Sequence, residues 1–389
     1  MNTNIDTANL CKYIDECKDE LKKLLIDLCK IPAPSHFEQE RASFCEKWFK
    51  EHCTKNVHTD RALNVICEYG NENAREIIVF MAHMDTVFPD TESMPIREEN
   101  GILYCPGVGD DTANLAILML CARYIFKTRP STKYKILFVA NSCEEGLGNL
   151  KGSRELLSTY GERVRAVISF DLDTSTLICR AVGSHRYGIK ISTKGGHSYF
   201  DFGNDNAIQI ASSIISELYA QNAPQDATYN VGTISGGTSV NTIAQSCEFT
   251  YEYRCELEFS LELMKSKFEK IIQKYVSTGF DIKVECIGKR PGMGELKSPS
   301  EQEALIALAE GIYEELLGTV PAREAGSTDC NIPLSMGINS VCLGLIRMSG
   351  AHTRSEYVEL DSLPKGLEIA VNTVVSVCSV DFDKFCENS

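Results

Sequence analysis

Short apolar runs and longer amphipathic stretches alternate along the first half of the chain, and this alternation restricts the fold more than any other feature. Helical patterns lie near residues 15–30, 38–52, 113–126 and 150–158, and strand-like runs fall near 64–68 and 76–81, at "YKILFVA" and at "AVISFD". This order favours an α/β fold with a mostly parallel sheet flanked by helices. In such folds, binding sites collect beyond the carboxyl ends of the strands.

The pattern changes after "GSHRYG". Residues 187–294 read as strand, helix, two strands, helix and strand, which predicts a two-layer α+β domain inserted into the first one. The chain then returns to a helix near 301–317, a short strand "SVCLGL" and a helix from 363 to about 380. We therefore expect one domain from residues 1–186 and 295–389, interrupted by the inserted domain.

The charge and the N-terminus limit the partners and the compartment. The formal net charge of -15 disfavours nucleic acid and anionic membrane as partners. Residues 1–20 lack the pattern of a signal peptide, and no apolar run is long enough to span a membrane. The 17 cysteines are scattered without a C-x-x-C pair, so they read mostly as reduced core thiols. These features predict a cytoplasmic protein.

Acidic and histidine residues follow several of the predicted strands. Because strand ends converge at one edge of a parallel sheet, these side chains are expected to meet, and that many buried carboxylates repel one another unless a cation lies among them. Zinc and similar ions accept mixed imidazole and carboxylate ligands. The residues are His83, Asp85, Asp110, Asp111, Glu144, Glu145, Asp171, Asp173 and His352.

The spacing of His83 and Asp85 suits a metal site, because one imidazole nitrogen can bind metal while the nearby carboxylate holds the N–H of the other. Taken alone, this pair also fits a solvated loop histidine beside a capping aspartate. Adjacent acids such as Asp110–Asp111 and Glu144–Glu145 also occur on solvated turns and in first helical turns. The metal interpretation depends on all of them falling at strand ends together.

Nearly the whole chain resembles the dizinc exopeptidases and deacylases that include peptidase T, glutamate carboxypeptidase, aminoacylase and succinyl-diaminopimelate desuccinylase. The motifs that carry the resemblance occur in order: "AHMDTV", "GVGDD", "NSCEEGLG", "SFD", "GGHS", "GGTSVNTIA", "GSTD" and "GAHTRSEYV". The resemblance implies a dizinc catalytic domain of the zinc exopeptidase type, with two divalent ions, most simply zinc, although cobalt or manganese would also serve.

The resemblance also implies a role for each matching residue. It makes His83, Asp110, Glu145, Asp171 and His352 metal ligands, with Asp110 bridging the two ions and often followed by a cis peptide bond. It makes Asp85 the residue that orients His83, and Glu144 the general base. Asp173 is left as a loop residue.

The inserted domain resembles a lid and dimerisation domain, which implies a homodimer. There His197 of "GGHS" would reach the active site of the partner subunit and polarise the scissile carbonyl, whereas the motif alone also fits an exposed histidine after a glycine turn. Asn241 and Arg254 match substrate-contacting positions, but they also read as an ordinary turn residue and an exposed strand arginine.

Two departures from the family pattern concern charge. Thr112–Ala113 stands where relatives usually have Lys-Gly, which alters the local charge balance without removing a ligand. In "PAREAGSTD", Ala325 falls where peptidase T has a substrate-binding arginine, whereas Arg323 matches an arginine of glutamate carboxypeptidase. Arg323 is therefore a candidate clamp for a substrate carboxylate, and equally an exposed loop arginine.

Together, these observations predict an exopeptidase that hydrolyses short peptides with metal-activated water and Glu144 as the general base. An N-acyl amino acid deacylase is the alternative within the enzyme class. A catalytically silent binding protein of the same fold is the alternative outside it, and the intact Glu144 and ligand set oppose it.

Overall fold

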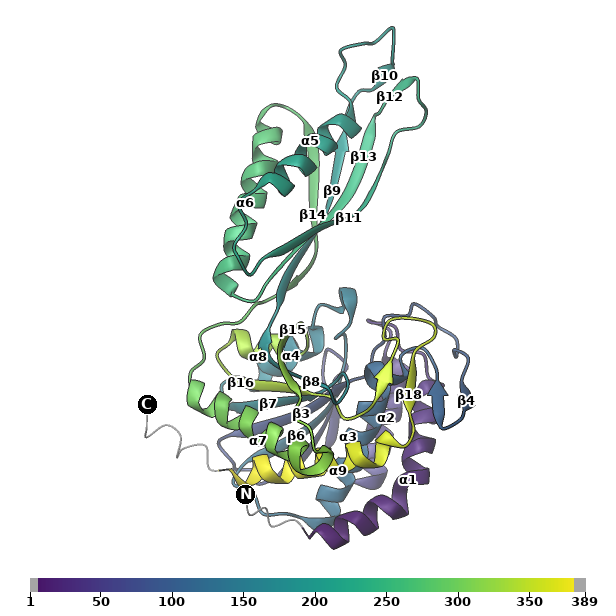
Figure 1. The fold of residues 1–389 in the computed structure, drawn as a ribbon, viewed down its shortest axis with the longest axis vertical. Coiled ribbons are helices and arrows are strands. Elements are labelled where there is room, and N and C mark those ends of the chain that lie inside the picture. The colour runs from purple at the N-terminus through teal and green to yellow at the C-terminus, as the bar shows by residue number, and fades with distance from the viewer. Residues whose placement is uncertain (1–5, 381–389) are drawn as a thin grey trace. The chain divides into compact units, whose positions relative to one another are not determined.

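The computed structural model describes residues 6–380, which form two compact units (Figure 1). Unit 1 contains residues up to Arg180 and from Glu295 onward, and unit 2 runs from Ala181 to Gly294. Unit 2 begins six residues before the predicted boundary at 187, because the segment "GSHRYG" already belongs to it. It is the first part of strand β9, Gly183–Ser192, whose side chains are largely buried along its length.

Unit 1 is built on an eight-stranded sheet with the order β1-β2-β6-β3-β7-β16-β8-β15. The four central strands, β6, β3, β7 and β16, run parallel, while β2 and β8 pair antiparallel with the outer members of this group. The expected α/β sheet is therefore confirmed. The strands are β1 Val57–Thr59, β2 Val65–Gly70, β3 Ile77–His83, β6 Lys135–Asn141, β7 Val164–Phe170, β8 Thr176–Ala181, β15 Ala322–Gly326 and β16 Asn339–Leu343.

Helices cover both faces of this sheet (Figure 1). Strand β3 shows why, because its seven residues are all buried and alternate between two cores. Phe80 packs with α1, α3, α7 and α9, whereas Val79 packs with α4 and α8. The helices are α1 Thr7–Cys29, α2 Gln39–His52, α3 Asn114–Thr128, α4 Lys151–Tyr160, α7 Pro299–Leu317, α8 Asn331–Ser335 and α9 Ser362–Ser379, with short turns η1 Val108–Ala113 and η2 Gly146–Gly148.

A small antiparallel sheet joins two segments that are far apart in the sequence. Its order is β17-β18-β5-β4, and β18 pairs with β5. Strand β5 leads into η1, and β17 and β18 flank the loop that contains His352. The sheet therefore places the His352 loop beside η1. Its strands are β4 Arg97–Glu99, β5 Ile102–Tyr104, β17 Met348–Ser349 and β18 Tyr357–Glu359.

Unit 2 is a two-layer α+β structure with a four-stranded antiparallel sheet in the order β11-β13-β9-β14. Buried residues alternate along β13, and Phe249 and Tyr251 pack with Phe268 of α6 in the core of the unit. A short pair, β10–β12, extends from one end of the sheet. Its remaining elements are β10 Gly196–His197, β11 Thr228–Gly236, β12 Thr242–Ile243, β13 Ser246–Cys255, β14 Asp281–Arg290, α5 Ala207–Ala220 and α6 Glu258–Ser277.

Two further properties concern the described part of the chain. Among residues 6–380, none of the helices has the length and apolar character that crossing a membrane requires. The cysteines between these residues are free thiols, and most of them are buried.

Candidate metal centre

Strand β3 ends at His83, which is buried at the carboxyl edge of the parallel strands. Its Nδ1 lies 3.0 Å from the backbone carbonyl oxygen of Asp85 and 3.5 Å from the Asp85 carboxylate. Because a carbonyl oxygen only accepts, Nδ1 donates to it, and Nε2, which faces the Asp110 carboxylate, also donates there unless a cation lies between the two groups. The hydrogen bond that fixes the tautomer thus goes to the backbone of Asp85, and not to its carboxylate as the spacing predicts.

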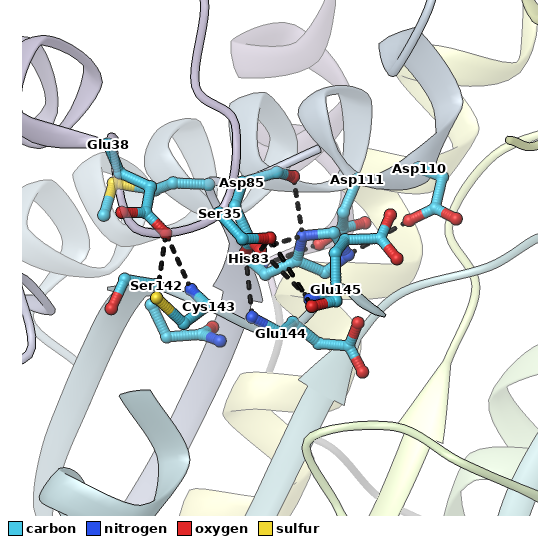
Figure 2. Close-up of polar contacts among 12 residues, drawn as sticks. Ser35, Glu38, His83, Asp85, Asp110, Asp111, Ser142, Cys143, Glu144 and Glu145 are labelled. Atoms are coloured by element: carbon cyan, nitrogen blue, oxygen red, sulfur yellow. Dashed lines mark hydrogen bonds and ion pairs between the residues drawn. The ribbon is translucent and has the colours of Figure 1, made fainter. Parts of the chain in front are cut away.

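The carboxylate of Asp85 instead holds the turn that follows β6. Its Oδ1 accepts the backbone N–H of Glu144 at 2.9 Å, and its Oδ2 accepts the N–H of Glu145 at 3.0 Å and the hydroxyl of Ser35 at 2.6 Å (Figure 2). Burial would raise the pKa of Asp85, but contacts with His83, Ser35 and the Glu144 amide hold it below its usual value. Asp85 therefore positions the Glu144–Glu145 pair.

Asp110 lies in η1, and the peptide bond between Asp110 and Asp111 is cis. One carboxylate oxygen of Asp110 is 3.0 Å from Nε2 of His83, and the other is 3.0 Å from Nε2 of His352. Burial alone would raise the pKa of Asp110, and the two histidines overcome that effect and lower it. A carboxylate between two imidazoles has the arrangement that a bridging ligand requires.

His352 and Glu145 meet on the other side of Asp110. Nε2 of His352 lies 3.3 Å from Oε2 of Glu145, and Asp110 and Glu145 raise the pKa of His352 to about 10. Glu145 is buried, and its Oε1 has no hydrogen-bond partner in the described part of the protein. Burial and the charge of Asp110 raise the pKa of Glu145. A buried carboxylate oxygen of this kind suits a cation better than water or another acid.

Asp171, directly after β7, completes the set of predicted ligands. Two groups of ligand atoms lie within 4.8 Å of one another: His83 with Asp110 and Glu145, and His83 with Asp111 and Asp171. Burial and the charge of Asp110 raise the pKa of Asp171 to about 7. The structure therefore brings all five predicted ligand residues to one place, although their roles as ligands stay a prediction.

Asp111 also belongs to this place, although the sequence interpretation gave it no role. Its Oδ2 accepts the backbone N–H of His83 at 2.9 Å, and its Oδ1 accepts a hydrogen bond from Asn114 at 2.7 Å. Burial and the charge of Asp171 hold its pKa well above the usual range. Asp111 thus fixes the end of β3 against η1.

The donor set fits two borderline divalent cations. It combines two imidazoles with carboxylates, Nε2 of His83 lies 3.0 Å from a carboxylate oxygen of Asp110, and Oε1 of Glu145 has no hydrogen-bond partner within residues 6–380. Zinc, cobalt and manganese accept such nitrogen and oxygen ligands. Glu144 is buried beside these residues but belongs to neither group of ligand atoms, which leaves it available for proton transfer.

Two more buried acids support the centre and were missed in the sequence. Glu356 accepts the backbone N–H groups of Gly107, Gly109 and Asp110 at 2.9, 2.7 and 2.9 Å, so it clamps η1 to the His352 loop. Burial raises the pKa of Glu356 to about 7, against the effect of these hydrogen bonds. In the sequence, the one feature that could have identified Glu356 is its place four residues after His352 in the motif "GAHTRSEYV".

Glu38 supports the turn after β6 from the other side. Its Oε1 accepts the backbone N–H of Cys143 at 3.0 Å, the Cys143 thiol at 3.1 Å and the N–H of His36 at 3.1 Å (Figure 2). The Cys143 amide directly precedes Glu144. Glu38 and Asp85 therefore hold three successive backbone amides of this turn. The sequence shows Glu38 only as the first residue of a predicted helix.

The predicted substrate-binding residues of unit 2 fall at two ends of its sheet. His197 and Asn241 are neighbours near the β10–β12 pair, where the N–H of Ser198 donates to the Asn241 carbonyl oxygen at 3.0 Å. Arg254 lies near the other end of β13 and makes two hydrogen bonds of 3.1 Å to Glu252. The structure brings His197 and Asn241 together but separates Arg254 from them.

Arg323 of unit 1 is an exposed residue of β15. Its guanidinium binds both carboxylate oxygens of Glu310, at 2.6 and 2.8 Å, and also Glu303 at 2.9 Å. These acids raise the pKa of Arg323. Because its fork is engaged by two acids of the same chain, a substrate carboxylate would have to displace them, and a role as a substrate clamp stays a prediction.

Comparison with known proteins gives the family. The sequence profile of Peptidase family M20/M25/M40 matches residues 79–376. The chain belongs to this family. The expected membership of the metal-dependent exopeptidases and deacylases is thereby confirmed, while the comparison leaves the substrate open.

Individual relatives span both kinds of activity. A succinyl-diaminopimelate desuccinylase of Corynebacterium glutamicum is 24% identical, covering 86% of this chain and 91% of its own. A tripeptidase structure from Staphylococcus aureus is 22% identical with a TM-score of 0.75, covering 92% of this chain and 99% of its own. A dinuclear metal-binding peptidase from Bacillus subtilis is 18% identical with a TM-score of 0.61, covering 93% and 99% of the two chains.

Proposed function

We propose that this protein is a two-metal exopeptidase that removes one residue from a short peptide. The observation that carries the proposal is the position of Asp110, 3.0 Å from the Nε2 atoms of both His83 and His352, with the Glu144–Glu145 turn held beside it by Asp85. His83, Asp110, Glu145, Asp171 and His352 would hold two divalent cations, most simply zinc.

Two such cations would polarise the scissile carbonyl and lower the pKa of a water molecule. The residues of the chain handle the proton. Glu144 would accept it from the attacking water and deliver it to the leaving amine, a transfer worth roughly 10²- to 10⁴-fold in rate. Hydrogen bonds from the Glu144 and Glu145 amides to Asp85 fix the direction in which both side chains leave the turn.

The decisive variant is Glu144→Gln, which keeps the shape of the side chain and removes the proton acceptor. Turnover of di- and tripeptides should fall by roughly 10²-fold or more, while two equivalents of zinc stay bound. Glu51→Gln, an exposed change on α2, is the matched control and should leave turnover unchanged. A Glu144→Gln protein with wild-type turnover would exclude this residue as the general base.

We also propose that the enzyme is a homodimer in which His197 acts on the substrate bound to the partner subunit. His197 is exposed, and its Nδ1 accepts the backbone N–H groups of Tyr199 at 3.2 Å and Phe200 at 3.4 Å. The proton is therefore on Nε2, which gives the loop an imidazole N–H donor suited to a carbonyl oxygen. The exposed Tyr199, Phe200 and Phe202 beside it also favour a covered surface.

Mixing two inactive variants tests this arrangement. If His197 acts across a dimer, Glu144→Gln and His197→Ala proteins should each be inactive alone and recover activity when their subunits exchange. If His197 acts within its own chain, no activity returns on mixing, although light scattering could still show a dimer.

A deacylase is the second candidate, favoured by the match to the desuccinylase over most of both chains. Comparing turnover of free-amine peptides with that of N-succinyl and N-acetyl amino acids separates the two activities. If only the acylated substrates are cleaved, the deacylase proposal replaces the exopeptidase proposal, and the proposed metal centre still stands.

A further inference from the structure

Arg41 is a buried arginine beside the metal centre, with only 2% of its surface exposed. Its guanidinium donates to the carbonyl oxygens of Leu28 at 3.1 Å, Ile31 at 3.0 Å and Met84 at 2.8 Å, and to the hydroxyl of Thr112 at 3.3 Å. Within residues 6–380, all its hydrogen bonds go to uncharged oxygens. A buried cation held in this way is unusual, because burial of an unpaired charge opposes folding.

The segments that Arg41 joins are the ones that present the metal ligands. Met84 lies between His83 and Asp85 at the end of β3, and Thr112 directly follows Asp110–Asp111 in η1. The Thr112 hydroxyl in turn donates to the carbonyl oxygen of Gly107, within the same turn. One guanidinium therefore links the end of β3 to η1.

The charge of Arg41 has a counterpart in the surplus of acids at the centre. Burial lowers the pKa of Arg41, and several nearby groups, of which Asp85 has the smallest effect, oppose that change. The Arg41 guanidinium and the Asp85 carboxylate thus attract one another through space, although within residues 6–380 no hydrogen bond joins them.

We propose that Arg41 is a positioning residue whose buried guanidinium holds η1 against the end of β3 through its contacts with Met84 and Thr112. A lysine at position 112 would then be able to supply this buried positive charge in place of Arg41. The inference rests on the proposed metal centre, but it does not depend on which substrate the enzyme cleaves.

A double-mutant cycle tests the exchange, with zinc affinity measured by chelator competition and the melting temperature of the metal-free protein as a second readout. Arg41→Met should weaken zinc binding by roughly 10- to 100-fold, the usual effect of losing a residue that orients ligands. Thr112→Lys alone should also weaken it, because the new ammonium group would crowd the guanidinium, now 3.3 Å from the Thr112 hydroxyl. The double variant should bind zinc more tightly than either single variant.

The control cycle combines Thr112→Lys with Arg123→Met. Arg123 is a partly buried arginine of α3 that binds Glu20 through two hydrogen bonds, so its loss should add to that of Thr112→Lys without rescue. Additive effects in the Arg41 cycle, or unchanged zinc affinity in Arg41→Met, would overturn the proposal. Arg41→Lys, which keeps the charge but loses the fork, should fall between wild type and Arg41→Met.

Thr112→Val keeps the test decisive if Arg41→Met does not fold. It removes the hydroxyl that Arg41 contacts and retains the volume, so zinc affinity should fall several-fold, whereas Thr373→Val on α9 should leave it unchanged. Wild-type zinc affinity in Thr112→Val would refute the link. If the wild-type protein cleaves no peptide yet these zinc affinities change as expected, the proposed function fails and this proposal stands.

Discussion

The contact of Glu356 with η1 gives a quantitative prediction, with Glu356→Gln as the perturbation. The wild-type carboxylate accepts three backbone N–H groups, two through Oε1 and one through Oε2. In glutamine, an NH₂ group replaces one of these oxygens. Depending on its orientation, it faces either the N–H group of Gly107 or the N–H groups of Gly109 and Asp110. At least one hydrogen bond is lost, and those that remain lose the assistance of the charge.

The magnitude follows from these bonds. A buried donor left without an acceptor costs about 1–3 kcal/mol, and charge-assisted bonds are roughly twice as strong as neutral ones. We therefore expect Glu356→Gln to lower the free energy of unfolding by about 2–4 kcal/mol. Because Gly109 and Asp110 are held by the same oxygen, zinc affinity should also fall by roughly 10- to 100-fold.

The assay is a urea titration with and without zinc, together with chelator competition, at pH 8. The carboxylate form of Glu356 predominates there, since its pKa is raised to about 7. Glu301→Gln is the matched control, because Glu301 is equally buried and binds Arg165 and Asn339 at the amino-terminal edge of the sheet. It should lower stability and leave zinc affinity unchanged. Equal zinc affinity in Glu356→Gln and wild type would refute the reasoning.

Three other outcomes are expected. Asp85→Asn places an NH₂ group against the amide of Glu144 or Glu145, so kcat should fall by roughly 10- to 100-fold. Steady-state kinetics with a zinc titration measures this effect, and an unchanged kcat would contradict it. Removing zinc with a chelator should lower Tm reversibly, since zinc at 1,000 times its Kd adds about 4 kcal/mol to stability. Equal Tm values in calorimetry with and without zinc would count against a resident metal. Burial lowers the pKa of His185 from 6.5 to about 4, so its neutral form stabilises unit 2 above pH 6.5, and that contribution is lost as pH falls toward 4. Urea titrations should show this loss, about 3 kcal/mol, in wild type and not in His185→Gln.

Residues placed by strand ends were predictable from the sequence. His83 follows a run of apolar residues that could only be a buried strand, and Asp171 follows another, so their meeting at one sheet edge required only that the strands be parallel. The bridging role predicted for Asp110 came from the resemblance, since spacing alone could not separate Asp110 from Asp111. The cis peptide bond expected after Asp110 is present.

Residues whose partners are backbone groups were not predictable. Glu356, Glu38 and Arg41 bind amides or carbonyls of loops distant in sequence, and a sequence pattern does not reveal such partners. The boundary at 187 was predicted from a change in the secondary-structure pattern of the sequence, whereas β9 is a continuous strand that starts at Gly183. Arg323 could not be assigned because the sequence does not show that Glu310 and Glu303 of α7 lie beside it.

The position of β16 in the sheet has a consequence for biosynthesis. This strand lies between β7 and β8, yet the chain reaches it only after the whole of unit 2 has been made. A growing polypeptide on the ribosome therefore carries His83, Asp110, Glu145 and Asp171 while the space between two neighbouring strands is still vacant and His352 does not yet exist. At about 5–20 residues per second, synthesis from Asp171 to His352 takes roughly 10–35 seconds. The residues of the proposed metal centre are therefore complete only after β16 and the His352 loop have been made.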